Sequence, residues 1–445
     1  MVMNLSSAQA KTAYEIARTL KTKGFTVYFA GGCVRDFLRN VEPKDFDIAT
    51  TATPDQVEEI FPKTIPVGKQ FGVMLVMQGP TPFEVATFRR EGAYPDGRHP
   101  SQVSFTDPEE DARRRDFTVN GLFYDPFCEK VIDYVGGGQD LKKGLIRAIG
   151  DPQKRFEEDK LRLLRAVRFA ANLGFSIEPE TWKWIRELAP QIHKVSGERI
   201  RDELIKTFTR GEGAGRGLEL LSESSLLKEI LPEVEAMKGV EQPPEFHPEG
   251  DVFIHTRMLL EKLENPSPVL AFAALLHDVG KPPTFQVREG RIRFYEHSRV
   301  GAEMSEKILR RLRFSNEEIE AVVACVDNHM KFANVKEMRE GKLKRFLSTV
   351  TFPTELELHR IDCESSHGLL DNFHFLKKKI IEFQQEELKP KPVLTGDDLK
   401  SLGMKPGPLM KPILEEAYEL QLEKKIQTKE EACRWAADKV KDAQK

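Results

Sequence analysis

The pattern of apolar residues changes once along this 445-residue chain, near residue 156, and that change limits the folds open to it. Before this point, short runs rich in aromatic and β-branched residues alternate with helical segments, which is typical of a small α/β domain. After it, apolar residues recur at helical spacing. A chain of this length exceeds one hydrophobic core. The sequence therefore predicts an α+β protein, with an N-terminal α/β head built on a small mixed sheet and helical domains after it.

The head is expected to contain two helices and four strands. The predicted helices span residues 1–24 and 34–39, and the predicted strands span 25–30, 45–49, 72–77 and 83–88. Breaks rich in Pro and Gly divide the rest of the chain. The predicted domains are the head over 1–150, a helical neck and body over 151–240, a second helical domain over 250–388 and a helical tail over 389–445.

Glycines 211, 213, 215 and 217 form a glycine-rich segment within the helical part of the chain. No predicted strand precedes them, although phosphate-binding loops follow a strand. We therefore expect this segment to be a loop between two helices.

Composition and charge are those of a globular protein, with 40% hydrophobic and 31% charged residues. No apolar run has the length of a membrane span, and the N-terminus lacks a signal-peptide pattern. Five scattered cysteines without a CxxC pair indicate reduced thiols, so we expect a cytoplasmic protein. A monomer and a homodimer are both open. Residues 152–216 carry 14 Lys and Arg against 10 Asp and Glu, which fits either an RNA backbone contact or a solvated helix surface.

Two carboxylates, Asp45 and Asp47, flank Phe46 in a predicted strand. Side chains two apart on a strand point to the same face, so both carboxylates are presented together. Such a pair repels unless a cation is shared, and hard oxygen ligands favour magnesium. Two magnesium ions about 3.5–4 Å apart can activate a hydroxyl and neutralise a leaving pyrophosphate. Glu84, on a later strand, is either a third ligand or a polar neighbour.

The pair Gly31-Gly32 lies after a predicted strand and before a short helix. Glycines in this position let backbone amides approach a triphosphate, and the helix N-terminus adds positive potential. Arg35, one turn into the helix, is expected to reach the phosphates. An ordinary strand-to-helix turn is the alternative.

Several ordered motifs resemble those of class II tRNA nucleotidyltransferases and bacterial poly(A) polymerases. The first two are GGCVRD (Gly31–Asp36) and KDFDIATTATP (Lys44–Pro54). The similarity continues through EVATFRREGAYPDGRHP, RRRDFTVNGLFYD, DYVGGGQDLKKGLIRAIG, EEDKLRLLRAVRFAA and SGERIRDELIK, over roughly the first half of the chain.

The resemblance implies a role for each matching position. Asp45 and Asp47 would hold the catalytic magnesium. The implied nucleotide-binding residues are Gly31, Gly32, Arg35, Arg115, Asp116, Asn120, Glu158, Asp159, Arg162 and Arg165. Within the segment between Phe88 and Val103, Asp96 and Arg98 would help the pocket switch from C to A.

Asp159 and Arg162 would read the incoming base. Three residues apart on a helix, they are expected to share a face. Asp accepts from an exocyclic amine and Arg donates to a ring nitrogen, a pattern that C and A match and G and U reverse. The rejected bases would leave buried polar groups unpaired. An ordinary salt bridge between the two residues is the alternative.

The run ALLHDVGKP places His277 and Asp278 at the end of an apolar segment, with His255 before it and Asp362 far after it. This order resembles the HD phosphohydrolase superfamily. Mixed nitrogen and oxygen ligands suit manganese, nickel, cobalt or iron, and a bound ion would activate water for phosphoester hydrolysis. His297 and His329 are further candidate ligands.

We therefore expect template-independent addition of C, C and A to the 3′ end of tRNA from CTP and ATP, with the tail gripping the tRNA. An enzyme that adds only A or only CC, and a poly(A) polymerase, remain open. An HD phosphohydrolase whose head only binds RNA is an alternative of another class.

Overall fold

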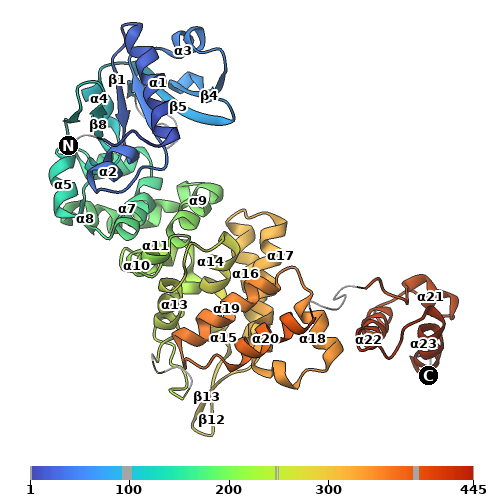
Figure 1. Ribbon diagram of the computed structural model, residues 1–445. Helices are drawn as coiled ribbons and strands as arrows, with labels where there is room; N and C mark the ends of the chain where they lie inside the picture. Colours follow the sequence, from blue (N-terminus) through green and yellow to red (C-terminus); the bar gives the residue numbers. More distant parts are fainter. Residues whose placement is uncertain (1–2, 93–102, 246–247, 249, 384–389, 444–445) are drawn as a thin grey trace. The chain divides into compact units, whose positions relative to one another are not determined.

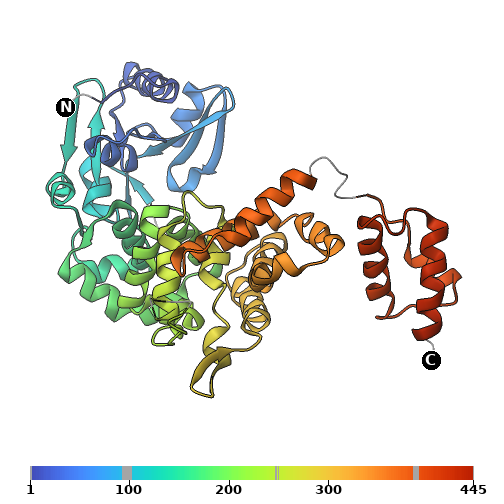
Figure 2. The same ribbon diagram turned by 60° about the horizontal axis from the view of Figure 1, so that its bottom comes forward.

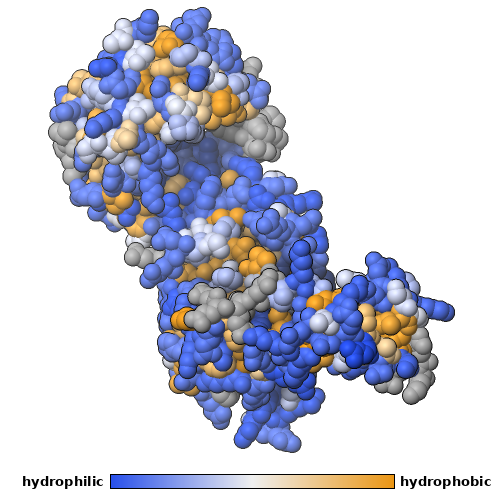
Figure 3. All heavy atoms as spheres, turned by 45° about the vertical axis from the view of Figure 1, so that its right-hand side comes forward, coloured by the Kyte–Doolittle hydropathy of each residue, from blue (hydrophilic) through white to orange (hydrophobic). Residues whose placement is uncertain are grey.

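The computed structural model describes residues 3–92, 103–245, 248, 250–383 and 390–443. Contacts divide the chain into unit 1, Met1–Glu235, and unit 2, Ala236–Lys445 (Figure 1). Hydrophilic residues predominate on the face drawn in Figure 3. Within the described ranges, no helix combines the length and apolar character needed to cross a bilayer.

Unit 1 contains one mixed sheet of seven strands in the order β3-β4-β5-β2-β1-β8-β9. The strands are β1 (Val27–Ala30), β2 (Asp47–Thr50), β3 (Thr64–Gly68), β4 (Val73–Gln78), β5 (Thr81–Thr87), β8 (Leu122–Asp125) and β9 (Lys130–Asp133). Only the central pair β2–β5 is parallel. Phe29 of β1, Ile48 of β2 and Phe123 of β8 are fully buried and form part of the core beside the sheet. The predicted α+β class and the mixed sheet are confirmed.

Helices flank the sheet and continue beyond it in unit 1 (Figure 1). They include α1 (Ala8–Thr22), α2 (Gly32–Leu38), α4 (Pro108–Arg114), α6 (Pro152–Glu158), α7 (Leu161–Leu173), α8 (Pro179–Leu188), α9 (Gly197–Phe208), α10 (Gly211–Glu223) and α11 (Leu226–Ile230). The first helix starts later than the sequence predicts, because the Ser7 side chain caps it by accepting from the Ala10 amide.

The prediction of a loop at the glycine-rich segment is wrong, because these glycines lie in the first turns of α10. Gly213 and Gly217 are four residues apart and share one helix face. A Cβ at Gly213 would lie 2.8 Å from the Ala171 carbonyl oxygen, and one at Gly217 would lie 2.5 Å from Cγ2 of Thr207. The glycines therefore let α10 approach α7 and α9 closely.

Unit 2 is helical apart from the hairpin β12 (Phe285–Arg288) and β13 (Arg291–Phe294). Its helices include α13 (Val252–Glu261), α14 (Pro268–Leu276), α15 (Lys281–Thr284), α16 (His297–Arg311), α17 (Asn316–Asn328), α18 (Glu340–Leu347), α19 (Phe352–Ser365), α20 (Asp371–Phe383), α21 (Gly396–Ser401), α22 (Met410–Leu422) and α23 (Lys429–Ala443). Helices α21–α23 have a small apolar core of their own, which includes Leu399, Ala417 and Ala436.

Candidate functional site

A cavity of about 760 Å³ lies in unit 1, lined by residues of the sheet and of α2 and α7. It brings together ten of the residues that the sequence singled out: Gly31, Gly32, Arg35, Asp47, Arg115, Asp116, Asn120, Asp159, Arg162 and Arg165. Glu84 also lines it. Two predicted residues of the head that the structure describes, Asp45 and Glu158, are outside this lining set. Asp45 lies two residues before Asp47, and Glu158 precedes Asp159 and pairs with Arg162.

Asp47 begins β2, whereas Asp45 precedes the strand, and both residues are exposed. The prediction that both belong to one strand is therefore wrong at Asp45. The reason is that the β1–β2 ladder ends at the pair Ala30–Asp47, since the chain turns into α2 after Ala30. Phe46 is nevertheless buried, as predicted.

Asp47 and Glu84 are neighbours on adjacent strands. Ile48 lies opposite Val85 in the parallel pair β2–β5, so the residues that precede them, Asp47 and Glu84, come side by side. Burial raises the pKa of Asp47, and Asp45 adds to the rise while Arg115 opposes it. Burial and the Asp47 charge raise the pKa of Glu84 in the same way. Clustered carboxylates that disfavour one another's charge fit a divalent cation with oxygen ligands.

Asn120 connects two arginines of the cavity through Asp116. The Arg35 guanidinium donates to Oδ1 of Asn120 at 2.8 Å, and the Asn120 amide donates to Asp116 at 3.0 Å. Arg165 donates to the other oxygen of Asp116 at 2.8 Å. Burial opposes ionisation of Asp116, but Arg165 and Asn120 together hold its pKa below the usual range. The network fixes the orientation of Arg35 and Arg165 on the cavity wall.

Asp111 organises a second group of arginines and was missed from the sequence. Its side chain is buried and accepts from Arg114 at 2.8 Å, from Arg115 at 3.1 Å and from the Arg89 amide at 3.2 Å. All three arginines line the cavity. Burial raises the pKa of Asp111, but Arg114 and Arg115 reverse this effect and lower it. The available signal was its spacing, three and four residues before two arginines.

Asp159 and Arg162 both line the cavity but do not share a helix face, so that prediction is wrong. Asp159 has extended backbone and lies in the break between α6 and α7. Its carboxylate pairs with Arg199 of α9 at 2.7 and 3.2 Å. Arg162 pairs with Glu158 at 2.5 Å. Each residue is thus oriented by a separate partner.

The predicted residues Asp96 and Arg98 lie outside the described residues. The described ends of that segment, β6 (Arg89–Glu91) and β7 (Val103–Phe105), pair as a short antiparallel ladder.

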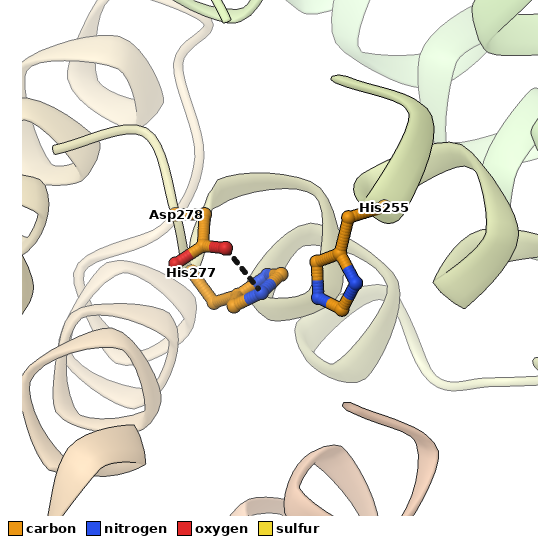
Figure 4. Close-up of side chains that lie close together, drawn as sticks. All are labelled: His255, His277 and Asp278. Carbon is orange, nitrogen blue, oxygen red and sulfur yellow. Dashed lines mark ion pairs between the residues drawn. The ribbon is translucent and has the colours of Figure 1, made fainter. Parts of the chain in front are cut away.

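Unit 2 holds the second predicted cluster (Figure 4). His255 comes from α13, and His277 and Asp278 follow α14 directly. One potential ligand atom from each of these three residues lies within 4.8 Å of the others. Nε2 of His277 is 3.2 Å from Asp278, and Nε2 of His255 is 2.9 Å from Oδ1 of Asp362, on α19. The four residues predicted from the sequence are therefore neighbours.

Asp278 also belongs to a second group, with His297 and His329, whose potential ligand atoms lie within 4.8 Å of one another. The two histidines meet through their Nε2 atoms at 3.1 Å. Burial lowers the pKa of His297 and lowers that of His329 to about 3, so both are neutral imidazoles near pH 7. His277 and Lys281 outweigh the effect of burial on Asp278 and hold its pKa well below the usual range. Neutral imidazoles and an ionised carboxylate are the forms that bind metals.

Three family models match successive parts of the chain. Residues 27–147 match the poly A polymerase head domain, residues 174–238 match a probable RNA- and SrmB-binding site of polymerase A, and residues 251–358 match the HD domain. The resemblances inferred from the sequence motifs are confirmed.

The curated relatives and the solved structures that the chain resembles are CCA-adding enzymes. The chain is 44% identical to the CCA-adding enzyme of Bacillus licheniformis over 219 residues, 49% of this chain and 55% of the relative. It thus spans about half the length of the curated relatives it matches. The CCA-adding enzyme of Bacillus stearothermophilus, solved in complex with CTP, matches with a TM-score of 0.75 and 26% identity, over 98% of this chain and 99% of that one. The Thermotoga maritima CCA-adding enzyme, solved with tRNA, shares the fold with a TM-score of 0.57, 18% identity and coverage of 98% and 97%.

Proposed function

We propose that this chain adds C, C and A to the 3′ end of tRNA from CTP and ATP and releases pyrophosphate. One observation carries the proposal: a single cavity holds clustered carboxylates, two sets of oriented arginines and the pair Asp159 and Arg162. Those are the parts that nucleotidyl transfer without a template requires. The similarity to CCA-adding enzymes supports the same reading.

The carboxylates would hold magnesium, with Asp45 and Asp47 as ligands and Glu84 beside them. Magnesium bound there would promote attack by the 3′ hydroxyl of the RNA and neutralise the leaving pyrophosphate. Arg35, Arg115 and the neighbouring arginines would bind the triphosphate, because their guanidinium groups match phosphate geometry. Their positions are set by Asn120, Asp116 and Asp111 before any nucleotide binds.

Base choice would rest on Asp159 and Arg162. Arg199 and Glu158 hold these side chains in fixed orientations in the absence of nucleotide. A base with an amine beside an acceptor nitrogen can pair with both, whereas U and G would leave both unsatisfied. Asp96 and Arg98 are proposed to assist the final A addition.

A direct test replaces Asp47 with Asn and measures incorporation of labelled CTP and ATP into tRNA. We expect incorporation to fall by at least two orders of magnitude while the thermal unfolding midpoint stays near that of the wild type, since metal stabilisation supplies several kcal/mol of the barrier. Asp55→Asn is the matched control, because Asp55 is an exposed carboxylate that pairs with Lys69 outside the cavity. Near-normal incorporation by the Asp47 variant would contradict the proposal.

For unit 2 we propose a transition-metal site with phosphohydrolase activity, held by His255, His277, Asp278 and Asp362, with His297 and His329 beside it. Support comes from the two ligand groups that share Asp278. The proposed domains are the head over 1–150, the neck and body over 151–240, the HD domain over 250–388 and a tRNA-binding tail over 389–445. The proposed location is the cytoplasm.

A further inference from the structure

The hairpin β12–β13 carries three arginines on one face. In its antiparallel register Arg288 lies directly opposite Arg291, and Gln286 lies opposite Arg293. Because side chains alternate along a strand, these four residues share a face. The opposite face carries the apolar residues of the hairpin: Phe285, Val287, Ile292 and Phe294. The hairpin is therefore amphipathic, with one basic side.

The turn holds the arginines in this arrangement. Glu289 and Gly290 both have positive φ, 51° and 72°, as in the tight two-residue turns that fix hairpin register. The pair Arg288–Arg291 cannot slip apart without a change of turn. Like charges directly opposite across a hairpin are destabilising. The register therefore keeps two like charges on directly opposite residues.

No carboxylate in the described part of the chain forms an ion pair with Arg288, Arg291 or Arg293. Nearby arginines on α16 behave differently, because Arg299 pairs with Glu296 at 2.7 Å and Arg310 pairs with Glu306 at 2.8 Å. Glu296, at the start of α16, is thereby paired, and Glu289, in the turn, is the only acidic residue within residues 285–294. Three positive charges are concentrated here in a chain whose net charge is −3.

The basic face is open to solvent. All three arginines are exposed. Figures 1 and 2 show both strands extending away from the helices of their unit. Tyr295, which follows β13, is 53% exposed, and the Arg288 guanidinium lies 5.3 Å from the centre of its ring. An exposed aromatic ring beside arginines that have no acidic partner is the combination that binds single-stranded nucleic acid by stacking and charge.

We infer that the basic face of this hairpin binds the phosphodiester backbone of RNA. A phosphate between Arg288 and Arg291 would replace their repulsion with two charge-assisted contacts. Arg293, two residue pairs along the ladder, would contact an adjacent phosphate. The choice of RNA as the polyanion rests on the proposed function. The contact adds an RNA-binding element in unit 2, separate from the nucleotide cavity of unit 1.

The test compares Arg288→Gln/Arg291→Gln with the wild type in binding to a tRNA transcript that lacks its three terminal nucleotides. Binding is measured by fluorescence anisotropy without nucleoside triphosphates, at salt concentrations from 50 to 200 mM. We expect the Kd to rise at least fivefold. The slope of log K against log salt should become shallower by about 0.7 to 0.9, since the variant loses one phosphate contact and each contact contributes about 0.7 to 0.9.

Stability and a matched variant separate binding from folding. The double variant should unfold at the same temperature as the wild type or higher, because the repulsion has been removed. Arg310→Gln, at an exposed arginine that has an acidic partner, should leave both Kd and slope unchanged. Arg293→Gln is a second variant at the adjacent phosphate and changes a single residue, and it is also expected to make the slope shallower by about 0.7 to 0.9.

Unchanged Kd and slope in both hairpin variants would overturn the inference. A wild-type dimer that the double variant converts to monomer in sedimentation, with RNA binding unaltered, would instead assign the face to contact between copies of the chain and also overturn it. Because binding is measured without nucleotides, failure of the proposed activity is distinguishable: a chain that binds tRNA through the hairpin without extending it contradicts the function alone.

Discussion

Asp111 is the residue whose contribution to the cavity is easiest to isolate. It touches no cavity space itself but holds Arg114 and Arg115 and the backbone of Arg89. Asp111→Asn keeps the shape and removes the charge, and should lower kcat/KM for CTP and ATP by about 10- to 100-fold through KM, since hydrogen bonds to charged groups contribute about 1.5–3 kcal/mol. Steady-state kinetics on a tRNA substrate measure this. Glu109→Gln is the control, because Glu109 is exposed and pairs with Arg113.

The same substitution has a pH signature. The pKa of Asp111 is lowered in the folded protein, so its ionised form stabilises the fold above the unfolded-state value of about 3.9 and loses this effect as the pH falls through the lower folded-state value. The difference in unfolding free energy between wild type and Asp111→Asn should therefore shrink between pH 5 and pH 3. A constant difference over this range, or unchanged kinetics with an intact fold, would show that Asp111 does not set the arginines.

Sequence spacing identified the residues that meet in the cavity better than it identified their partners. The sequence predicts that Asp159 and Arg162 share one helix face, because helical periodicity is extended through residue 159. The break between α6 and α7 instead turns Asp159 toward Arg199, 40 residues later in the chain. Partners at such separation leave no periodic signal, so their identity depends on tertiary packing.

At the scale of elements, α10 gives a clear packing test. Gly217→Ala places a methyl group against Thr207 Cγ2, and overpacking of this kind costs about 1–3 kcal/mol, more than the roughly 0.5–1 kcal/mol that Ala gains over Gly in a helix. We expect a lower free energy of unfolding in urea. Thr207→Ser removes Cγ2 and keeps the hydroxyl that donates to the Glu203 carbonyl oxygen. In that background the Gly217→Ala penalty should disappear, and an equal penalty in both backgrounds would rule out the contact.

Strands were predictable where a short run of apolar, aromatic or β-branched residues ends at a local turn, as in β1, β4 and β5. The helical glycines of α10 were not, because glycine clusters between periodic segments usually mark loops. Their helical conformation depends on neighbouring helices that come close enough to exclude a Cβ. The sequence shows where the glycines are, but only the packing of α10 against α7 and α9 explains why glycine is needed there.

At the scale of the molecule, the two proposed activities reside in separate units and should be separable. Asp278→Asn removes the carboxylate shared by both ligand groups of unit 2. We expect the variant to lose bound manganese, nickel, cobalt or iron in metal analysis and to lose phosphodiester hydrolysis. Its nucleotide incorporation into tRNA should remain within about twofold of wild type, since the two clusters lie in separate units and share no residue. A wild-type protein that binds none of these metals would contradict the proposed site.

Addition of CCA is tested most directly with three tRNA transcripts that lack one, two or three terminal nucleotides. Each transcript is incubated with CTP, with ATP or with both, and product lengths are read at single-nucleotide resolution. We expect two C additions from CTP, one A addition only after CC, and no further extension with both nucleotides present. An enzyme that adds only the terminal A, that stops after CC with ATP present, or that adds a long run of A would contradict the proposed CCA addition.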